Sequence, residues 1–129
     1  MIIVDSSVWI DFFNGTDSAE ADRLDSLLGV DPIAVGDLIL TEVLQGFRAD
    51  QDFDRVRSGL LTLTVYPMLG LDAAVRAAEN YRTLRKQGLT VRKTADVIIA
   101  SFCIEHGHSL LFSDRDFLPF VERLGLEPA

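Results

Sequence analysis

The stretch MIIVDSSVWIDFF, residues 1–13, decides the fold because it joins a buried strand to a helix through an acid. Residues 2–4 are β-branched throughout, a pattern typical of a strand that is covered on both faces. Residues 8–13 predict a helix, which the Asn-Gly pair at 14–15 ends. Asp5 is therefore expected at the carboxyl end of a buried strand.

The rest of the chain alternates strand patterns with helix patterns. Parallel strands need crossover connections, and helices supply them, so the class is α/β with a parallel sheet covered on both faces. Ser6 or Ser7 is expected to cap the first helix, and Ser113-Asp114 the last one. Further strands are predicted at residues 33–35, 63–66, 110–112 and from Leu126, and further helices at residues 19–28, 37–47, 53–61, 71–86, 94–106 and 114–124.

The composition suits one compact domain. With 129 residues, of which 48% are hydrophobic, we expect a single domain spanning residues 1–129. There is no apolar run of the roughly 18 residues that span a bilayer, and an acid follows the first strand too soon for a secretion signal. We therefore expect a cytoplasmic protein. The single cysteine, Cys103, lies in the apolar segment VIIASFCI and is expected in the core.

The net charge of −8 at pH 7 is unfavourable for a nucleic-acid partner, because phosphate backbones attract lysine and arginine. Any RNA site must then be local. Much of the positive charge falls within a dozen residues, and these residues form either a solvated helix face or a track for phosphates. They are Arg82, Arg85, Lys86, Arg92 and Lys93.

Acids follow the predicted strands, which is where ligands bind in open parallel sheets. Asp5 ends the first strand and Asp114 follows the fourth, so two acids far apart in the chain can face one crevice. Asp116 lies at the same helix start as Asp114. Asp37 also follows a strand, but its place at the start of a helix explains it.

Two more acids lie within apolar helices. Asp96 shares a helix face with the apolar residues three, four and seven positions further on, so it points toward the core side. Glu42 lies near the border of an apolar stripe. Each acid also has a simpler explanation, since a carboxylate in a first helical turn caps the helix or complements its dipole. The joint placement is harder to explain in that way.

If these carboxylates converge, they need a cation, because two like charges about 4 Å apart repel by about 4 kcal/mol at an effective dielectric of 20. Ligation by oxygen alone suits Mg²⁺ or Mn²⁺, and no cysteine or histidine occurs at zinc-like spacing. Such a metal activates water and stabilises charge on a phosphoryl group. Phosphodiester hydrolysis is the reaction that this chemistry favours.

Four segments, in this order, resemble the PIN-domain ribonucleases, specifically the VapC-type toxins of bacterial toxin–antitoxin pairs. They are IIVDSSVWIDFF, an internal glutamate, KTADVIIA and LLFSDRDF. The resemblance covers essentially the whole chain. It implies an α/β/α sandwich on a parallel sheet, an acidic cluster that binds Mg²⁺ or Mn²⁺, and an endoribonuclease that leaves a 5′-phosphate and a 3′-hydroxyl. It also implies a homodimer and inhibition by a VapB-type antitoxin.

Carried over residue by residue, the resemblance assigns a catalytic set that also binds metal. Asp116 matches a second acid that assists and is included among the metal ligands. Ser6 or Ser7 matches a hydroxyl that supports the cluster by hydrogen bonding. Glu42 is expected to orient or deprotonate the attacking water. The catalytic set is Asp5, Glu42, Asp96 and Asp114.

Two other readings stay open. A haloacid-dehalogenase-like phosphatase also places an aspartate after its first strand, but it needs a second acid two residues later, where this chain has Ser7. A non-catalytic α/β domain that binds a partner would have the acids without turnover. Nucleotide folds are poorly supported, because neither glycine-rich phosphate motif occurs.

Overall fold

The computed structural model describes residues 1–129, and it contains a five-stranded, wholly parallel sheet in the order β3-β2-β1-β4-β5. The predicted α/β class is therefore confirmed. The strands are β1 (Ile2–Val4), β2 (Ile33–Gly36), β3 (Thr64–Tyr66), β4 (Ser109–Leu111) and β5 (Glu127–Pro128).

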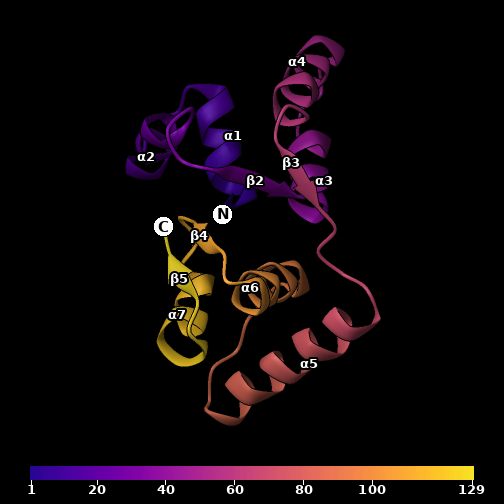
Figure 1. Cartoon of the computed structure of the whole chain (residues 1–129), viewed down its shortest axis with the longest axis vertical. Helices are drawn as coiled ribbons and strands as arrows, with labels where there is room; N and C mark the ends of the chain where they lie inside the picture. Colours follow the sequence, from indigo (N-terminus) through magenta and orange to yellow (C-terminus); the bar gives the residue numbers. More distant parts are fainter.

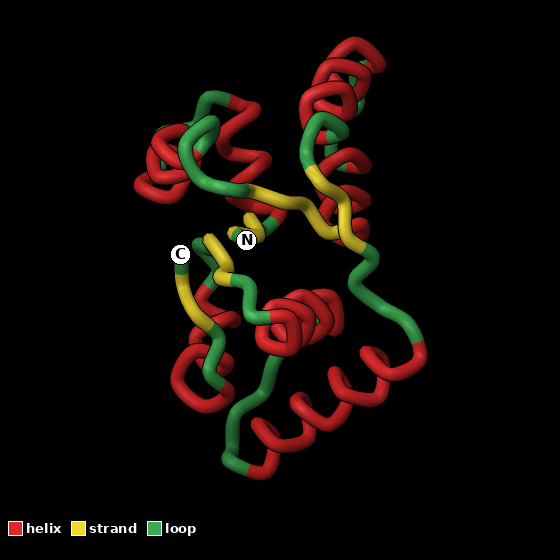
Figure 2. Tube along the Cα trace, in the orientation of Figure 1, coloured by secondary structure: helices red, strands yellow, loops and turns green.

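The helices form two layers, one on each side of the sheet. Figure 1 shows α1 to α4 on one side and α5, α6 and α7 on the other, as the predicted sandwich requires. Figure 2 shows loops between most of the short strands and helices, whereas α3 follows β2 directly. The helices are α1 (Ser6–Asn14), α2 (Ala19–Leu27), α3 (Asp37–Gln45), α4 (Asp50–Leu60), α5 (Leu71–Lys86), α6 (Thr94–His106) and α7 (Leu118–Leu124), with a short 3-10 helix η1 (Arg115–Phe117).

Apolar side chains from both layers fill the core against the central strands. Cys103 is buried, as expected from its apolar surroundings, and Trp9 belongs to the same core. The central strand β1 is fully covered at Ile3 and Val4, because it lies between β2 and β4 and under helices on both faces. None of the helices combines the length and apolar character that crossing a bilayer requires.

Three local predictions need correction. The residue at the N-cap position, directly before α1, is Asp5, so the prediction that Ser6 or Ser7 caps this helix is wrong. The predicted last helix is divided into η1 and α7, because Pro119 cannot donate a backbone hydrogen bond and is favoured in a first helical turn. The last strand begins at Glu127, one residue after the buried Leu126.

Candidate active site

The order of the strands reverses at β1, so the carboxyl ends of β1 and β4 form a topological switch point. From β1 the chain adds β2 and then β3 on one side, and it then crosses to add β4 and β5 on the other side. Such a switch point is where ligands bind in open parallel sheets. Asp5 directly follows β1, and Asp114 lies three residues after the end of β4 at Leu111. The two acids that the sequence placed at strand ends therefore lie at the same edge of the sheet.

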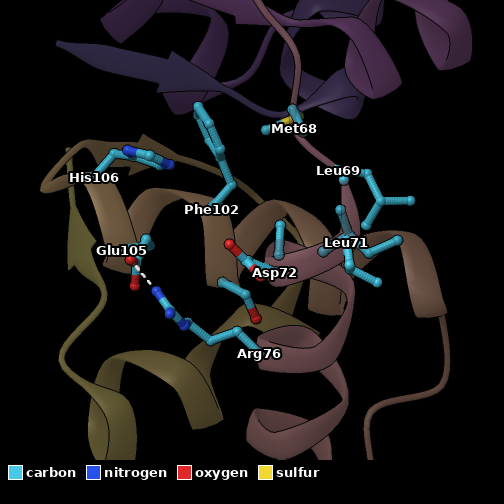
Figure 3. A pocket seen from close by; sticks show the side chains of 12 residues that line it. Met68, Leu69, Leu71, Asp72, Arg76, Phe102, Glu105 and His106 are labelled. Atoms are coloured by element: carbon cyan, nitrogen blue, oxygen red, sulfur yellow. Dashed lines mark ion pairs between the residues drawn. The ribbon is translucent and has the colours of Figure 1, made fainter.

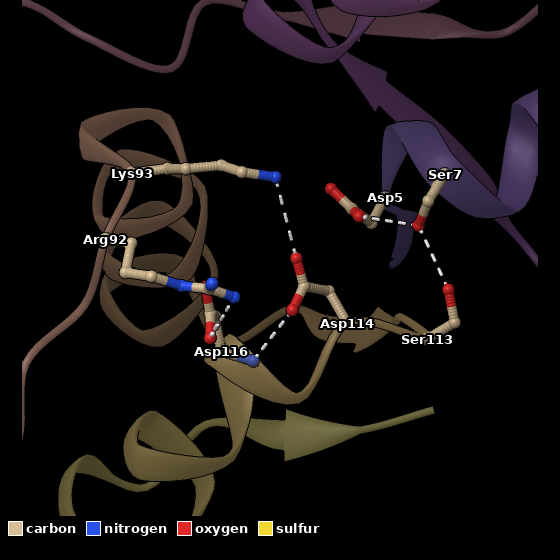
Figure 4. Close-up of polar contacts among 7 residues, drawn as sticks. All are labelled: Asp5, Ser7, Arg92, Lys93, Ser113, Asp114 and Asp116. Carbon is tan, nitrogen blue, oxygen red and sulfur yellow. Dashed lines mark hydrogen bonds and ion pairs between the residues drawn. The ribbon is translucent and has the colours of Figure 1, made fainter.

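Asp5 is fixed between the two central strands. Its backbone N–H donates to the carbonyl of Leu111, at 2.9 Å, and the hydroxyl of Ser7 donates to Asp5 Oδ2, at 3.0 Å. Ser7 Oγ also lies 3.1 Å from Ser113 Oγ, which connects the start of α1 to the end of β4 (Figure 4). Burial raises the pKa of Asp5, and the charge of Asp114 adds to the rise, while the hydrogen bond from Ser7 lowers it.

Asp96 is a buried carboxylate in the first turn of α6, with only 5% of the residue exposed. Its Oδ2 atom is buried and has no hydrogen-bond partner. Burial raises the pKa of Asp96 to about 6, and the charge of Asp5 adds to the rise, while Lys93 opposes it. An unpartnered buried carboxylate oxygen is costly, so it indicates a ligand that supplies positive charge.

Glu42 reaches the same region from α3. The residue is half-buried, its Oε1 atom has no hydrogen-bond partner, and α3 is in contact with α6. Burial raises the pKa of Glu42, and the charge of Asp5 raises it further, while Ser6 and Lys93 act in the opposite direction. The border position that the sequence indicated for Glu42 therefore places it beside the acids of the central strands.

Asp114 and Asp116 complete the group at the start of η1. Carboxylate oxygens of Asp96, Asp114 and Asp116 all lie within 4.8 Å of one another. Asp114 Oδ1 accepts the backbone N–H of Asp116, at 2.9 Å, so the simpler explanation of a helix cap holds for one of its oxygens. The other oxygen, Oδ2, lies 3.7 Å from Lys93 Nζ. We call these three acids, together with Asp5 and Glu42, the acidic cluster.

The acidic cluster fits a divalent cation. Several carboxylates converge, and two of their buried oxygens, on Glu42 and Asp96, have no hydrogen-bond partner. No histidine or cysteine belongs to the group, and ligation by oxygen alone is typical of Mg²⁺, Mn²⁺ and Ca²⁺. The residues that are present therefore offer a site for a hard divalent ion rather than for zinc.

Sequence reasoning missed some residues at this site. Ser113 was expected only as a helix cap, yet its hydroxyl lies beside that of Ser7. Arg92 and Lys93 were expected either on a solvated face or on a phosphate track, and both form ion pairs with the acidic cluster. The signal for Lys93 was its position directly before the helix that carries Asp96, where a cation is unusual.

A separate cavity of about 390 Å³ lies between the start of α5 and the later turns of α6 (Figure 3). Apolar side chains such as Phe102 and Met68 line it, and Arg76 forms an ion pair with Glu105 across it. None of the five acids of the acidic cluster lines this cavity. This cavity is therefore distinct from the acidic cluster, which is the candidate active site.

Comparisons with known proteins agree with the fold. A family model of the PIN domain matches residues 2–120. Ribonuclease VapC11 of Mycobacterium tuberculosis is 34% identical over 122 residues, which cover 91% of this chain and 89% of that protein.

Two solved structures share the fold at low identity. VapBC2 from Rickettsia felis, bound to a DNA fragment from its promoter, has a TM-score of 0.77 and 18% identity, with 100% of this chain and 98% of that chain covered. A toxin–antitoxin complex from Klebsiella pneumoniae has a TM-score of 0.72 and 21% identity, with 91% and 90% covered. The fold, the order of the motifs and the match over most of the sequence lead to one conclusion: the chain belongs to the PIN-domain family.

Proposed function

We propose that this protein is an endoribonuclease that depends on Mg²⁺ or Mn²⁺ and acts as the toxin of a type II toxin–antitoxin system. The observation that carries the proposal is a group of three acids, Asp96, Asp114 and Asp116, whose carboxylate oxygens lie within 4.8 Å of one another. The charges of Asp5 and Glu42 act on Asp96, and Glu42 and Asp96 each have a buried oxygen with no hydrogen-bond partner. The similarity to a VapC ribonuclease supports RNA as the substrate. We propose that residues 1–129 act as one domain, and the cytoplasmic location stays a prediction.

Each acid has a role in this proposal. Asp5, Asp96, Asp114 and Asp116 would hold the cation, and Glu42 would complete the set. The bound ion would supply Lewis-acid stabilisation of phosphoryl charge and a lower pKa for water. Glu42 would orient or deprotonate the attacking water, because its raised pKa suits a general base. Ser7 and Ser113 hold the carboxylate of Asp5 in place.

Cleavage of a labelled single-stranded RNA tests the activity. We expect cleavage with Mg²⁺ or Mn²⁺, none with EDTA, and products that carry a 5′-phosphate and a 3′-hydroxyl. Asp96→Asn is expected to abolish cleavage, whereas Asp25→Asn, an exposed acid on α2, is the matched control and keeps it. Cleavage that persists in EDTA, or full activity of Asp96→Asn, would contradict the proposed mechanism.

The same preparations separate the rival readings. A haloacid-dehalogenase-like phosphatase would hydrolyse p-nitrophenyl phosphate and leave RNA intact. A non-catalytic domain would bind the metal and show no turnover on either substrate. Because this chain has Ser7 where the phosphatase needs its second acid, we expect no phosphatase activity.

The toxin role and the partners need their own test. The similar Rickettsia protein is part of a VapBC assembly, and the Klebsiella protein is part of a toxin–antitoxin complex. We propose a VapB-type antitoxin as the partner and a homodimer as the free form. Expression without a partner is expected to be toxic, and Asp96→Asn is expected to relieve the toxicity. Harmless expression of active enzyme would refute the toxin role and leave the nuclease reading intact.

A further inference from the structure

Two cations of this chain form ion pairs with the acidic cluster (Figure 4). The Nε and Nη2 atoms of Arg92 lie 3.2 and 3.4 Å from the carboxylate oxygens of Asp116. Lys93 Nζ lies 3.7 Å from Asp114 Oδ2. Both cations come from the short connection between α5 and α6. The acids that would hold a metal are thus already paired with positive groups of the same chain.

The local structure does not favour cations at this position. Lys93 is the residue that precedes α6, and its side chain makes no capping hydrogen bond. Serine, threonine, aspartate and asparagine are preferred there, and the helix dipole repels positive charge at a helix N-terminus. A departure from local preference is expected at functional sites. The two cations therefore need an explanation beyond the stability of α6.

This segment lies between buried residues, while its two charged side chains are exposed to solvent. Val91 and Asp96, which flank the pair, are 4% and 5% exposed. The side chains of Arg92 and Lys93 are 76% and 63% exposed. Ion pairs that are open to solvent contribute little, so either cation can exchange its carboxylate for another anion at small cost.

We propose that Arg92 and Lys93 are the phosphate-binding cations of this active site and that metal binding releases them. Without metal they neutralise Asp116 and Asp114. A divalent ion held by these acids would cancel the charge that pairs with the guanidinium and ammonium groups. Arg92 and Lys93 would then be available to RNA phosphates beside the cluster, and the planar fork of Arg92 suits a phosphate in two-point contact. This inference rests on the proposed nuclease function.

The first arm of the test measures Mn²⁺ binding by calorimetry on Arg92→Gln, Lys93→Gln and Arg115→Gln. Arg115 is the matched control, because it is exposed, lies between Asp114 and Asp116 in sequence, and forms no ion pair. Removal of a competing exposed ion pair corresponds to about two- to fivefold in an equilibrium constant. We expect Mn²⁺ to bind tighter by that factor in Arg92→Gln and Lys93→Gln than in Arg115→Gln.

The second arm measures binding of a labelled single-stranded RNA at several salt concentrations, with Mn²⁺ and with EDTA. Glu42→Gln is introduced in every protein to suppress cleavage. Each phosphate contact of a single strand contributes about 0.7 to the slope of log affinity against log salt. With Mn²⁺ we expect Arg92→Gln and Lys93→Gln each to lower the slope by about 0.7. Arg115→Gln is expected to leave the slope unchanged, and with EDTA the variants are expected to behave alike.

The outcomes are distinguishable. If the slopes of Arg92→Gln and Lys93→Gln with Mn²⁺ equal that of Arg115→Gln, the two cations do not bind phosphate and the inference is wrong. Equal Mn²⁺ affinities of all three variants would refute the proposal that the metal displaces Arg92 and Lys93 from the carboxylates. A wild-type protein that does not cleave RNA would instead refute the proposed function. Because all three side chains are exposed, thermal unfolding is expected to show that every variant stays folded.

Discussion

Replacement of Asp96 by asparagine is expected to stabilise the metal-free protein while it abolishes cleavage. The carboxylate is 5% exposed, and its Oδ2 atom has no hydrogen-bond partner. It also lies close enough to Asp5 for the charge of that residue to raise its pKa. A neutral amide of the same shape removes the buried charge and can donate a hydrogen bond to a neighbouring carboxylate.

The pKa of Asp96 sets the size and the sign of this effect. Folding raises the pKa from 3.8 to about 6, so the folded state favours the protonated acid. Stability is therefore highest below the unfolded pKa and falls as the pH rises from about 4 through about 6. At about 1.36 kcal/mol per pKa unit the full penalty is about 3 kcal/mol. Solvent screens the charge, because the side chains of the neighbouring Asp114 and Asp116 are 28% and 18% exposed, so we expect a gain of about 1–2 kcal/mol for Asp96→Asn.

Urea unfolding in EDTA measures this gain, with Asp25→Asn as the control for the general relief of negative charge. At about pH 7.5 we expect Asp96→Asn to be the more stable protein, and at about pH 4.5 we expect the gain to shrink to roughly a third. With Mn²⁺ the order reverses, because only the wild type gains the free energy of metal binding. If Asp96→Asn is no more stable than Asp25→Asn in EDTA at the higher pH, Asp96 does not carry an uncompensated charge and the reasoning fails.

Three further substitutions separate support of the site from support of the fold. Ser7→Ala removes the hydrogen bond that lowers the pKa of Asp5. The acid limb of the profile of cleavage rate against pH should therefore move to higher pH, and Mn²⁺ affinity should fall about tenfold. An unchanged profile would contradict this expectation. Asp37 accepts a hydrogen bond from the backbone N–H of Met68, at 3.1 Å. Asp37→Ala should therefore lower the free energy of unfolding, measured in urea, by about 1–3 kcal/mol and leave Mn²⁺ affinity unchanged. A loss of Mn²⁺ binding would place Asp37 in the site. The side chain of Met68 fills the space that a Cβ of residue 36 would need. Gly36→Ala should therefore lower the free energy of unfolding by about 1–3 kcal/mol, and the double variant with Met68→Ala should recover part of that loss. An unchanged free energy of unfolding in the single variant would show that Met68 moves aside freely.

The parts of the fold and site that could be predicted come from sequence patterns that are compatible with only one local structure. Residues 2–4 are apolar on both faces, so the strand had to be central and parallel, and Asp5 had to lie at its carboxyl end. Asp96 was placed inward by the spacing of its apolar neighbours, and it is buried. Asp114 was placed by the strand that precedes it.

The parts that could not be predicted depend on contacts between distant segments. The sequence did not specify that β4 pairs with β1 rather than with β3, and this pairing is what brings Ser113 to Ser7. The division of the last helix depends on Pro119, whose position is compatible with either one helix or two. The pairing of Arg92 with Asp116 is a choice of one rotamer of a long exposed side chain, which no local pattern fixes.

The net charge of −8 is the strongest argument against RNA as the substrate, and the structure indicates how the conflict is resolved. Repulsion between exposed charges falls off over about 8–10 Å at physiological salt, so the charge within one such distance of the scissile phosphate matters more than the total. Around the acidic cluster, the N-termini of α1 and α6 and the side chains of Arg92 and Lys93 oppose the negative charge of the acids. A divalent ion then shifts the local balance toward positive charge, so RNA affinity should rise with Mn²⁺ concentration and saturate as the ion does. If affinity measured by fluorescence anisotropy in the Glu42→Gln variant is the same with Mn²⁺ and with EDTA, the acids do not control RNA binding and the phosphate must be bound elsewhere.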